Sequence, residues 1–273
     1  MASPRAVDRS ERMGVLPKAT LVVPCYNEAR RLCPDAFVQA MQRFPSLAFL
    51  FVDDGSSDET FEVLGTLCAA HPQQAHVVRL ARNGGKGEAV RQGVLRAFEQ
   101  DPEVVGYWDA DLATPLDEWA PMARLLESSR AAIVLGSRVK LLGRTIERDE
   151  LRHYMGRVFA TAVSQTLRLP VYDTQCGAKL FRVSDLTRRL FAEPFASRWI
   201  FDVEILARAL RLRERTENDR ESPLAVEYPL HSWIDVKGSK LRWHDFAHAA
   251  GDLAKIALYL RRGGRANGKA SGG

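Results

Sequence analysis

Short apolar segments alternate with segments of helical pattern through the first half of the chain, and this alternation restricts the possible folds more than any other feature. The apolar segments have the length of buried strands; they are Thr20–Pro24, Leu47–Val52, Ala75–Leu80, Val104–Trp108 and Ala132–Leu135. The predicted helices between them are Ala36–Phe44, Glu59–Ala70, Glu88–Glu99 and Pro115–Ser128. The sequence therefore predicts an α/β fold in which helices flank a mostly parallel central sheet.

The second half of the chain is less regular but carries two long amphipathic patterns. Leu151–Leu167 and Trp243–Leu260 each predict a helix with one apolar face. The two faces consist of Leu151, Met155, Val158, Ala162 and Thr166, and of Trp243, Phe246, Ala250, Leu253, Ile256 and Leu260. A further helix is expected at Trp199–Arg211 and a late strand at Ala225–Leu230. Residues 1–17 and 263–273 are expected to be a disordered lead and a disordered tail.

Composition excludes several classes of protein. No apolar run approaches the ~18–20 residues that a membrane span needs. The first twenty residues are charged and lack the apolar segment of a secretory signal. The four cysteines form no CxxC pair, which argues against a zinc ribbon or a disulfide scaffold and for a reducing compartment. We therefore expect a cytoplasmic protein.

Charge is unevenly distributed along the chain. The formal net charge is +5, but residues 1–137 carry 14 Lys and Arg against 18 Asp and Glu, whereas residues 138–273 carry 25 against 16. An acidic half suits a cation and a basic half suits phosphate or an anionic surface, although an uneven solvated surface explains the same numbers. The basic balance alone also fits nucleic acid, but no helix-turn-helix, zinc-finger or RNP-type signature is present, so we predict no nucleic-acid partner.

The most informative polar cluster follows the fourth predicted strand, at Asp109-Ala110-Asp111. Two carboxylates in this arrangement offer the hard oxygen ligands that Mg²⁺ or Mn²⁺ prefers. Such a metal would bridge the two phosphates of a nucleotide and stabilise the diphosphate as a leaving group. Acidic pairs are also common on surface loops, but ligands of α/β sheets bind beyond the carboxyl ends of the strands, which is where this pair lies.

Two more polar clusters follow neighbouring predicted strands. Asp53-Asp54-Gly55-Ser56 ends the second strand, and its carboxylates suit a ribose hydroxyl or a base N–H, although a helix start with turn residues is the alternative. Asn83–Gly87 places Lys86 between glycines at a helix start, but it has neither the spacing of a Walker A loop nor that of a dinucleotide fingerprint. We expect these loops and the acidic pair to converge into a single pocket.

Five motifs, taken in order, resemble family 2 glycosyltransferases of the GT-A fold. Four lie in the first half of the chain, at Val22–Glu28, Phe51–Thr60, Asn83–Gly93 and Asp109–Asp111, and Gly136–Arg138 follows them. The later segments Asp173–Phe181, Arg198–Leu206 and Trp233–Lys240 resemble the dolichyl-phosphate β-glucosyltransferase branch. The resemblance covers about residues 20–242. It implies a GT-A (Rossmann-like) domain at 18–242, with a nucleotide-sugar half at 18–137, an acceptor half at 138–242 and a C-terminal amphipathic helix at 243–262.

The resemblance implies an inverting transfer of a sugar from a nucleotide sugar, UDP-glucose above all, to a polyprenyl or dolichyl phosphate. The residues expected to bind the donor are Pro24, Tyr26, Asn27, Glu28, Asp53, Asp54, Lys86, Asp109, Ala110, Asp111, Gln175 and Cys176. Among these, Asp109 and Asp111 would hold Mg²⁺ or Mn²⁺. Small buried packing residues are the alternative for Cys176.

The same resemblance assigns the acceptor side and the catalytic residues. Arg138, Arg152, Arg157 and Lys240 are expected to contact phosphate, and Asp202, Asp111 and Arg138 are the predicted catalytic residues. An acceptor phosphate is already ionised and needs cations rather than a strong base. If the acceptor is instead a hydroxyl of a soluble substrate, Asp202 is expected to act as the general base.

Three further possibilities concern the membrane, a second copy of the chain and the absence of catalysis. The two amphipathic stripes with their flanking basic residues suit peripheral contact at the inner face of a membrane, but packing on the sheet or on a second copy of the chain explains them equally. A homo-oligomer is thus one expectation for the chain. A non-catalytic protein that binds nucleotide sugars would carry most of the same motifs, although the intact acidic pair argues against it.

Overall fold

A computed structural model describes residues 15–147, 150–198, 200–213, 222–236 and 249–260, and it places the side chains of 150–155 too uncertainly to describe. Its main sheet has seven strands in the order β3-β2-β1-β4-β7-β5-β8. These strands are β3 (Ala75–Arg79), β2 (Leu47–Asp53), β1 (Ala19–Cys25), β4 (Val104–Trp108), β7 (Ala178–Arg182), β5 (Ile133–Ser137) and β8 (Ala225–Pro229). A parallel pair, β6 (Thr145–Glu147) and β9 (Ser232–Ile234), forms a second small sheet.

The mostly parallel sheet confirms the predicted fold class. β1 pairs in parallel with β2 and β4, β2 with β3, and β5 with β8. The sequence did not reveal β7, which lies between β4 and β5 and is antiparallel to both. Its residues Ala178–Arg182 include the buried Lys179, so the strand lacks the purely apolar pattern of its neighbours.

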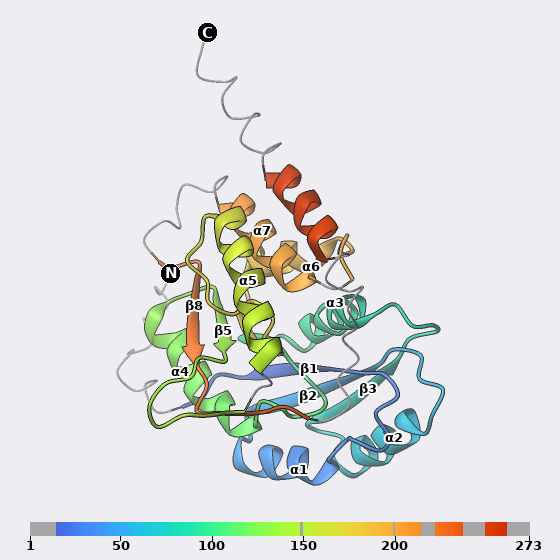
Figure 1. Ribbon diagram of the computed structural model, residues 1–273. Helices are drawn as coiled ribbons and strands as arrows, with labels where there is room; N and C mark the ends of the chain where they lie inside the picture. Colours follow the sequence, from blue (N-terminus) through green and yellow to red (C-terminus); the bar gives the residue numbers. More distant parts are fainter. Residues whose placement is uncertain (1–14, 148–149, 199, 214–221, 237–248, 261–273) are drawn as a thin grey trace, which may run out of the picture.

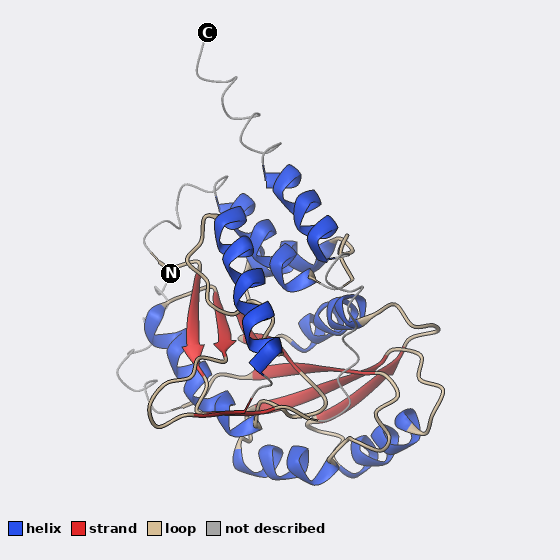
Figure 2. Ribbon diagram, in the orientation of Figure 1, coloured by secondary structure: helices blue, strands red, loops and turns tan. Residues whose placement is uncertain are grey.

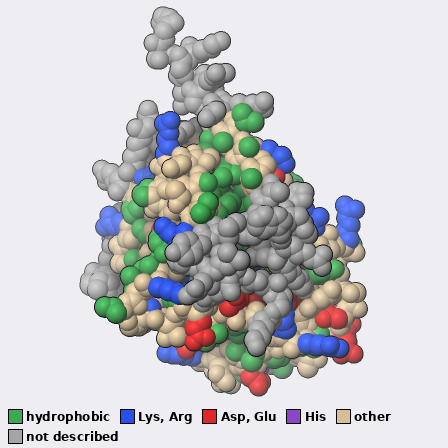
Figure 3. Space-filling view, in the orientation of Figure 1, with side chains coloured by type: hydrophobic (Ala, Val, Ile, Leu, Met, Phe, Trp, Pro, Cys, Tyr) green, Lys and Arg blue, Asp and Glu red, His purple; other side chains and the backbone are tan. Residues whose placement is uncertain are grey.

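Helices cover both faces of the sheet, as Figures 1 and 2 show. One face packs against α1 (Pro34–Arg43), α2 (Thr60–Ala70) and α4 (Trp119–Ser129), which is preceded by the 3₁₀ turn Leu116–Glu118. The other face packs against α3 (Lys86–Ala97), which ends in the 3₁₀ turn Phe98–Gln100, and against α5 (Glu150–Leu167), α6 (Asp185–Ala192) and α7 (Phe201–Arg213). On the side shown in Figure 3, acidic side chains gather over the lower half of the molecule, where α1 and α2 lie.

The two amphipathic stripes turn inward only in part. On α5, Val163 and Leu167 are buried in the core, whereas Val158 is 67% exposed, so the predicted stripe is rotated from the face that packs. Residues 249–260 form a helix beside α6 and α7 (Figure 1), and its Ile256 is buried while Leu253 packs against the same core. The expected Trp243 and Phe246 lie outside the described residues. Packing therefore accounts for Ile256 and Leu253 of the second stripe, whereas none of the first stripe's described members is buried.

Among the described residues, no helix combines the length and the apolar character needed to cross a bilayer. The four cysteines are all free.

Candidate active site

The loops that follow β1 and β2 are joined by direct hydrogen bonds at the carboxyl edge of the sheet. Asn27 N donates to Ser56 Oγ at 3.0 Å, and Ser57 N donates to Asn27 Oδ1 at 2.9 Å. The backbone is joined as well, because Asp54 N donates to Cys25 O at 2.8 Å. β1 and β2 are adjacent and parallel, so their carboxyl ends lie side by side at the same edge of the sheet.

The two adjacent aspartates that end β2 have different partners. Asp53 is fully buried; its Oδ1 accepts from Ser56 N at 3.0 Å, and its Oδ2 lies 3.2 Å from Arg79 Nε in an ion pair without hydrogen-bond geometry. Asp54 binds the glycine loop, accepting from Gly84 N at 2.7 Å and from Gly85 N at 2.8 Å. Burial raises the pKa of Asp54, and these two N–H donors offset part of that rise.

Lys86 connects the glycine loop to the acidic pair after β4. It is the first residue of α3, and its Nζ lies 2.5 Å from Asp109 Oδ1. Burial acts to lower the pKa of Lys86, but the charges of Asp109 and Asp202 outweigh it and raise the pKa above its ordinary value. Asp54, the glycine loop, Lys86 and Asp109 thus form one connected chain of contacts, so the three strand-end loops converge as the sequence predicts.

The acidic pair itself is held in a tight backbone setting. Asp109 N donates to Gly177 O at 3.0 Å, and an ideal Cβ at Gly177 would lie only 1.9 Å from Asp109 Oδ2. Asp111 Oδ1 accepts from Ala113 N at 3.1 Å. Burial, followed by the charge of Asp109, raises the pKa of Asp111. Any side chain at position 177 would therefore force the Asp109 carboxylate to move.

Asp109 and Asp111 fit a divalent cation that is shared with a diphosphate. The mutual repulsion that raises the pKa of Asp111 is the repulsion that a bound cation would relieve. Among the described residues, no group of three or more His, Cys, Asp or Glu side chains could hold a metal by itself. Mg²⁺ is commonly bound by one or two carboxylates together with substrate phosphates, which matches a two-carboxylate set.

A buried ion pair lies beneath the acidic pair. Lys179 Nζ donates to Asp202 Oδ1 at 2.6 Å and to Cys176 O at 2.6 Å, and both charged side chains are almost fully buried. Tyr107 O–H also donates to Asp202 Oδ1, and its ring centroid lies 5.2 Å from Lys179 Nζ and 6.0 Å from Lys86 Nζ. Asp202 is therefore close to the site, but its Oδ1 already accepts from two donors.

Arg138 directly follows β5 and forms an ion pair with Asp173. Its Nε and Nη2 donate to the two oxygens of Asp173 at 2.6 and 2.8 Å, and its guanidinium lies 5.2 Å from the ring of Trp233. Although burial opposes the charge, Asp173 raises the pKa of Arg138. Glu227 in turn fixes this segment by accepting from Asp173 N at 2.8 Å.

Comparison with known proteins assigns the chain to a family. The model of Glycosyl transferase family 2 matches residues 20–190. The chain belongs to this family.

Among its relatives is dolichyl-phosphate beta-glucosyltransferase ALG5C of Trichomonas vaginalis, 34% identical over 257 residues that cover 89% of this chain and 72% of the relative. Two solved structures share the fold. Glucosyl-3-phosphoglycerate synthase of Mycobacterium tuberculosis, solved with Mn²⁺, UDP and phosphoglyceric acid, has a TM-score of 0.59, 16% identity, and coverage of 92% of this chain and 80% of its own. Mannosyltransferase PcManGT of Pyrobaculum calidifontis, solved with GDP-Man and Mn²⁺, has a TM-score of 0.56, 17% identity, and coverage of 90% of this chain and 64% of its own.

The remaining predicted donor residues of this family 2 glycosyltransferase lie along the same edge. Pro24 is part of β1, Ala110 is buried between the two acids, and Tyr26 is 37% exposed beside the loop of Asn27. Glu28 N donates to Thr60 Oγ1 at 2.8 Å, and the Glu28 carboxylate accepts from Arg31 Nε at 2.9 Å.

Two donor residues come from the segment before β7. Gln175 Nε2 is buried and has no hydrogen-bond partner within the described part of the chain. Cys176 is fully buried, and burial raises the pKa of its thiol. The packing alternative for Cys176 therefore agrees with its environment.

The predicted phosphate contacts of the acceptor half are only partly described. Arg157 lies on α5 with its guanidinium 3.7 Å from the ring centroid of Tyr172. Arg152 is on the same helix, but its side chain is not described, and Lys240 lies outside the described residues.

The sequence analysis did not identify three residues of this site. They are Tyr107, Lys179 and Asp173, the last of which is the partner of Arg138. A lysine within an otherwise apolar strand was the available signal for Lys179, since a buried lysine requires a buried acid.

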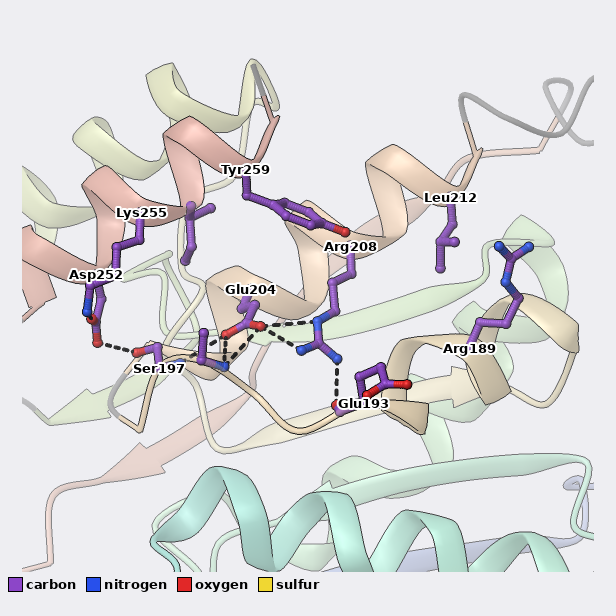
Figure 4. Close-up of a pocket in the computed structure, with 11 residues that line it drawn as sticks. Arg189, Glu193, Ser197, Glu204, Arg208, Leu212, Asp252, Lys255 and Tyr259 are labelled. Atoms are coloured by element: carbon purple, nitrogen blue, oxygen red, sulfur yellow. Dashed lines mark hydrogen bonds and ion pairs between the residues drawn. The ribbon is translucent and has the colours of Figure 1, made fainter. Parts of the chain in front are cut away.

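A cavity of about 370 Å³ lies elsewhere, between α6, α7 and the helix of residues 249–260. Figure 4 shows that its polar groups bind one another: Arg208 Nη2 donates to Glu204 at 2.7 Å, and Ser197 Oγ donates to Asp252 at 2.7 Å. None of the predicted donor residues lines it, so this cavity is separate from the transferase site.

Proposed function

We propose that this glycosyltransferase moves glucose from UDP-glucose to a dolichyl or polyprenyl phosphate with inversion at the anomeric carbon. The proposal rests on the convergence of three strand-end loops at Asp109, with Lys86 2.5 Å away. The similarity to the dolichyl-phosphate beta-glucosyltransferase of Trichomonas vaginalis supports glucose as the sugar and a dolichyl-phosphate acceptor for this chain.

The donor is proposed to lie across the ends of β2, β1 and β4. Asp53 and Asp54, which are buried and bound to the surrounding loops, would shape the nucleoside end of the site, and Lys86 would meet the diphosphate. Asp109 and Asp111 would hold Mg²⁺ or Mn²⁺, which supplies charge stabilisation to the departing diphosphate when it is bound. The unpartnered Gln175 Nε2 suits a hydroxyl of the sugar.

A phosphate acceptor and a hydroxyl acceptor would make different demands on Asp202. A general base needs a free oxygen within hydrogen-bond reach of the proton that it removes. Asp202 Oδ1 accepts from both Lys179 Nζ and Tyr107 O–H, and both donors stabilise the charged carboxylate. Both contacts are made at Oδ1, so they hold the Asp202 carboxylate in place within the site. A phosphate acceptor avoids the need for a general base because it attacks as an anion.

The basic residues of the acceptor half would position that anion. Arg138 is already bidentate with Asp173, so its role is to fix the local geometry and to add positive charge near the departing group. Arg157, which stacks on Tyr172, is the better described candidate for direct contact with the acceptor phosphate.

The experiment compares acceptors in the same preparation. With UDP-glucose and Mn²⁺, we expect transfer to a short-chain polyprenyl phosphate and none to the matching polyprenol. Asp111→Ala should abolish transfer, whereas Asp202→Asn should leave a substantial part of the transfer to polyprenyl phosphate. Full activity of Asp111→Ala in the presence of EDTA would refute the metal role, and efficient transfer to hydroxyl acceptors would favour the soluble alternative.

We further propose that the protein acts in the cytoplasm and touches the membrane peripherally, since a polyprenyl-phosphate acceptor resides in a bilayer.

A further inference from the structure

The segment that follows β5 presents two leucines at the tip of a hydrogen-bonded turn. Arg144 N donates to Leu141 O at 3.1 Å, and Gly143 has φ of +79° at the third position of this turn. A hydrogen bond from i+3 to i with positive φ at i+2 is the pattern of a type II turn. Leu142 at its tip is fully exposed, and Leu141 is 48% exposed.

The chemistry of this turn is unusual for a surface loop. Glycine, proline and short polar residues normally occupy turn tips, because they suit the backbone and remain hydrated. Here the tip residue is a large aliphatic side chain, and the two leucines are flanked by Lys140 and Arg144. Apolar side chains between basic residues are typical of segments that lie in the headgroup region of anionic membranes.

Both ends of the turn are anchored to strands of the fold. It begins four residues after Ser137, which ends β5, and Thr145 N donates to His231 O at 2.9 Å where β6 begins. Arg138 lies four residues before Leu142, so their Cα atoms are at most about 14 Å apart. The turn leaves the acceptor side of the site on the carboxyl side of β5, and Figure 1 shows the segment between β5 and α5 looping away from the sheet.

We infer that the Leu141–Arg144 turn inserts its two leucines into the surface of a phospholipid bilayer, with Lys140 toward anionic headgroups. The inference rests on the proposed function: the phosphate of a polyprenyl phosphate sits at the bilayer surface, so residues beside the acceptor side of the site lie at headgroup depth. The turn then holds the site at the depth where its acceptor arrives.

The test is co-sedimentation of the full chain with vesicles of phosphatidylcholine and phosphatidylglycerol. Leu142→Ser should weaken partitioning roughly tenfold, and the double change with Leu141→Ser should weaken it further. Lys140→Gln should weaken it severalfold and reduce its dependence on phosphatidylglycerol. The matched control is Val15→Ser, because Val15 is 76% exposed at the start of the described chain and should not alter binding.

Wild-type partitioning of the double variant, or no vesicle binding by the wild type at low salt, would overturn the inference. A change of oligomeric state in the double variant with unchanged vesicle binding would also overturn it, since the turn would then contact a second copy. A thermal shift with UDP-glucose and Mn²⁺ separates the two claims. If the turn variants keep that shift, they still bind the donor, and a loss of vesicle binding is then due to the turn. If the wild type shows no shift, the proposed function itself is refuted.

Discussion

Substituting Gly177 by alanine tests the acidic pair through a single added methyl group. Gly177 does not have positive φ, so alanine is compatible with the backbone, but its Cβ would lie 1.9 Å from Asp109 Oδ2 and 2.1 Å from Asp109 Cγ. An ordinary van der Waals contact needs about 3.4 Å, so the carboxylate must move by about 1.5 Å. Misplacement of a catalytic group by about 1 Å costs roughly a hundredfold in rate, or about 2.7 kcal/mol.

We therefore expect Gly177→Ala to lower kcat/KM for Mn²⁺-dependent glucosyl transfer by about a hundredfold and to weaken Mn²⁺ binding measured by calorimetry. Overpacking is expected to cost about 1–3 kcal/mol of stability, so thermal melts must first show a folded variant. Gly65→Ala in α2 is the matched control; nothing lies within 4 Å of its added Cβ, and it should be stabilising by about 1 kcal/mol. A folded Gly177→Ala protein with wild-type kcat/KM would refute the role of Asp109.

Three further predictions concern charge. Lys179→Met leaves Asp202 charged and buried without its cation, so urea denaturation should show that the free energy of unfolding falls by about 3–5 kcal/mol. A decrease as small as that of a typical surface substitution would contradict the role of the buried pair. The pKa of Asp111 is raised by burial and then by Asp109, so its ionised form costs stability, and the cost disappears as pH falls through the raised pKa. Asp111→Asn should therefore raise Tm at neutral pH, with the gain shrinking in acid, while Mn²⁺ binding is lost; a lower Tm at neutral pH would contradict this. Lys86→Met should tighten Mn²⁺ binding without nucleotide by on the order of tenfold, because the ammonium no longer competes at Asp109, and unchanged calorimetric affinity would contradict it.

The sequence was informative where one local pattern carried the structure. Apolar segments of strand length predicted β1 to β5, and polar clusters at their ends predicted that the donor loops would meet. The contacts from Asp54 to the glycine loop and from Lys86 to Asp109 confirm that convergence. Parallel neighbours make this inference robust, because their carboxyl ends share one edge of the sheet.

The sequence was less informative where function depends on contacts between distant segments. β7 joins the sheet centre in the antiparallel direction, and no local pattern specifies that order. The pairing of Lys179 with Asp202 spans 23 residues of sequence, and that of Arg138 with Asp173 spans 35. Asp202 and Arg138 were predicted to act on the substrate, but the structure gives each of them an internal partner.

Calorimetric titration of the wild type with UDP-glucose, with and without Mn²⁺, tests the central claim most directly. In the proposed pocket, Asp109 and Asp111 bind a cation, and the cation binds the diphosphate. This arrangement predicts tight one-to-one binding of UDP-glucose that is lost when Mn²⁺ is withheld. Equal affinity with and without the metal would contradict the account.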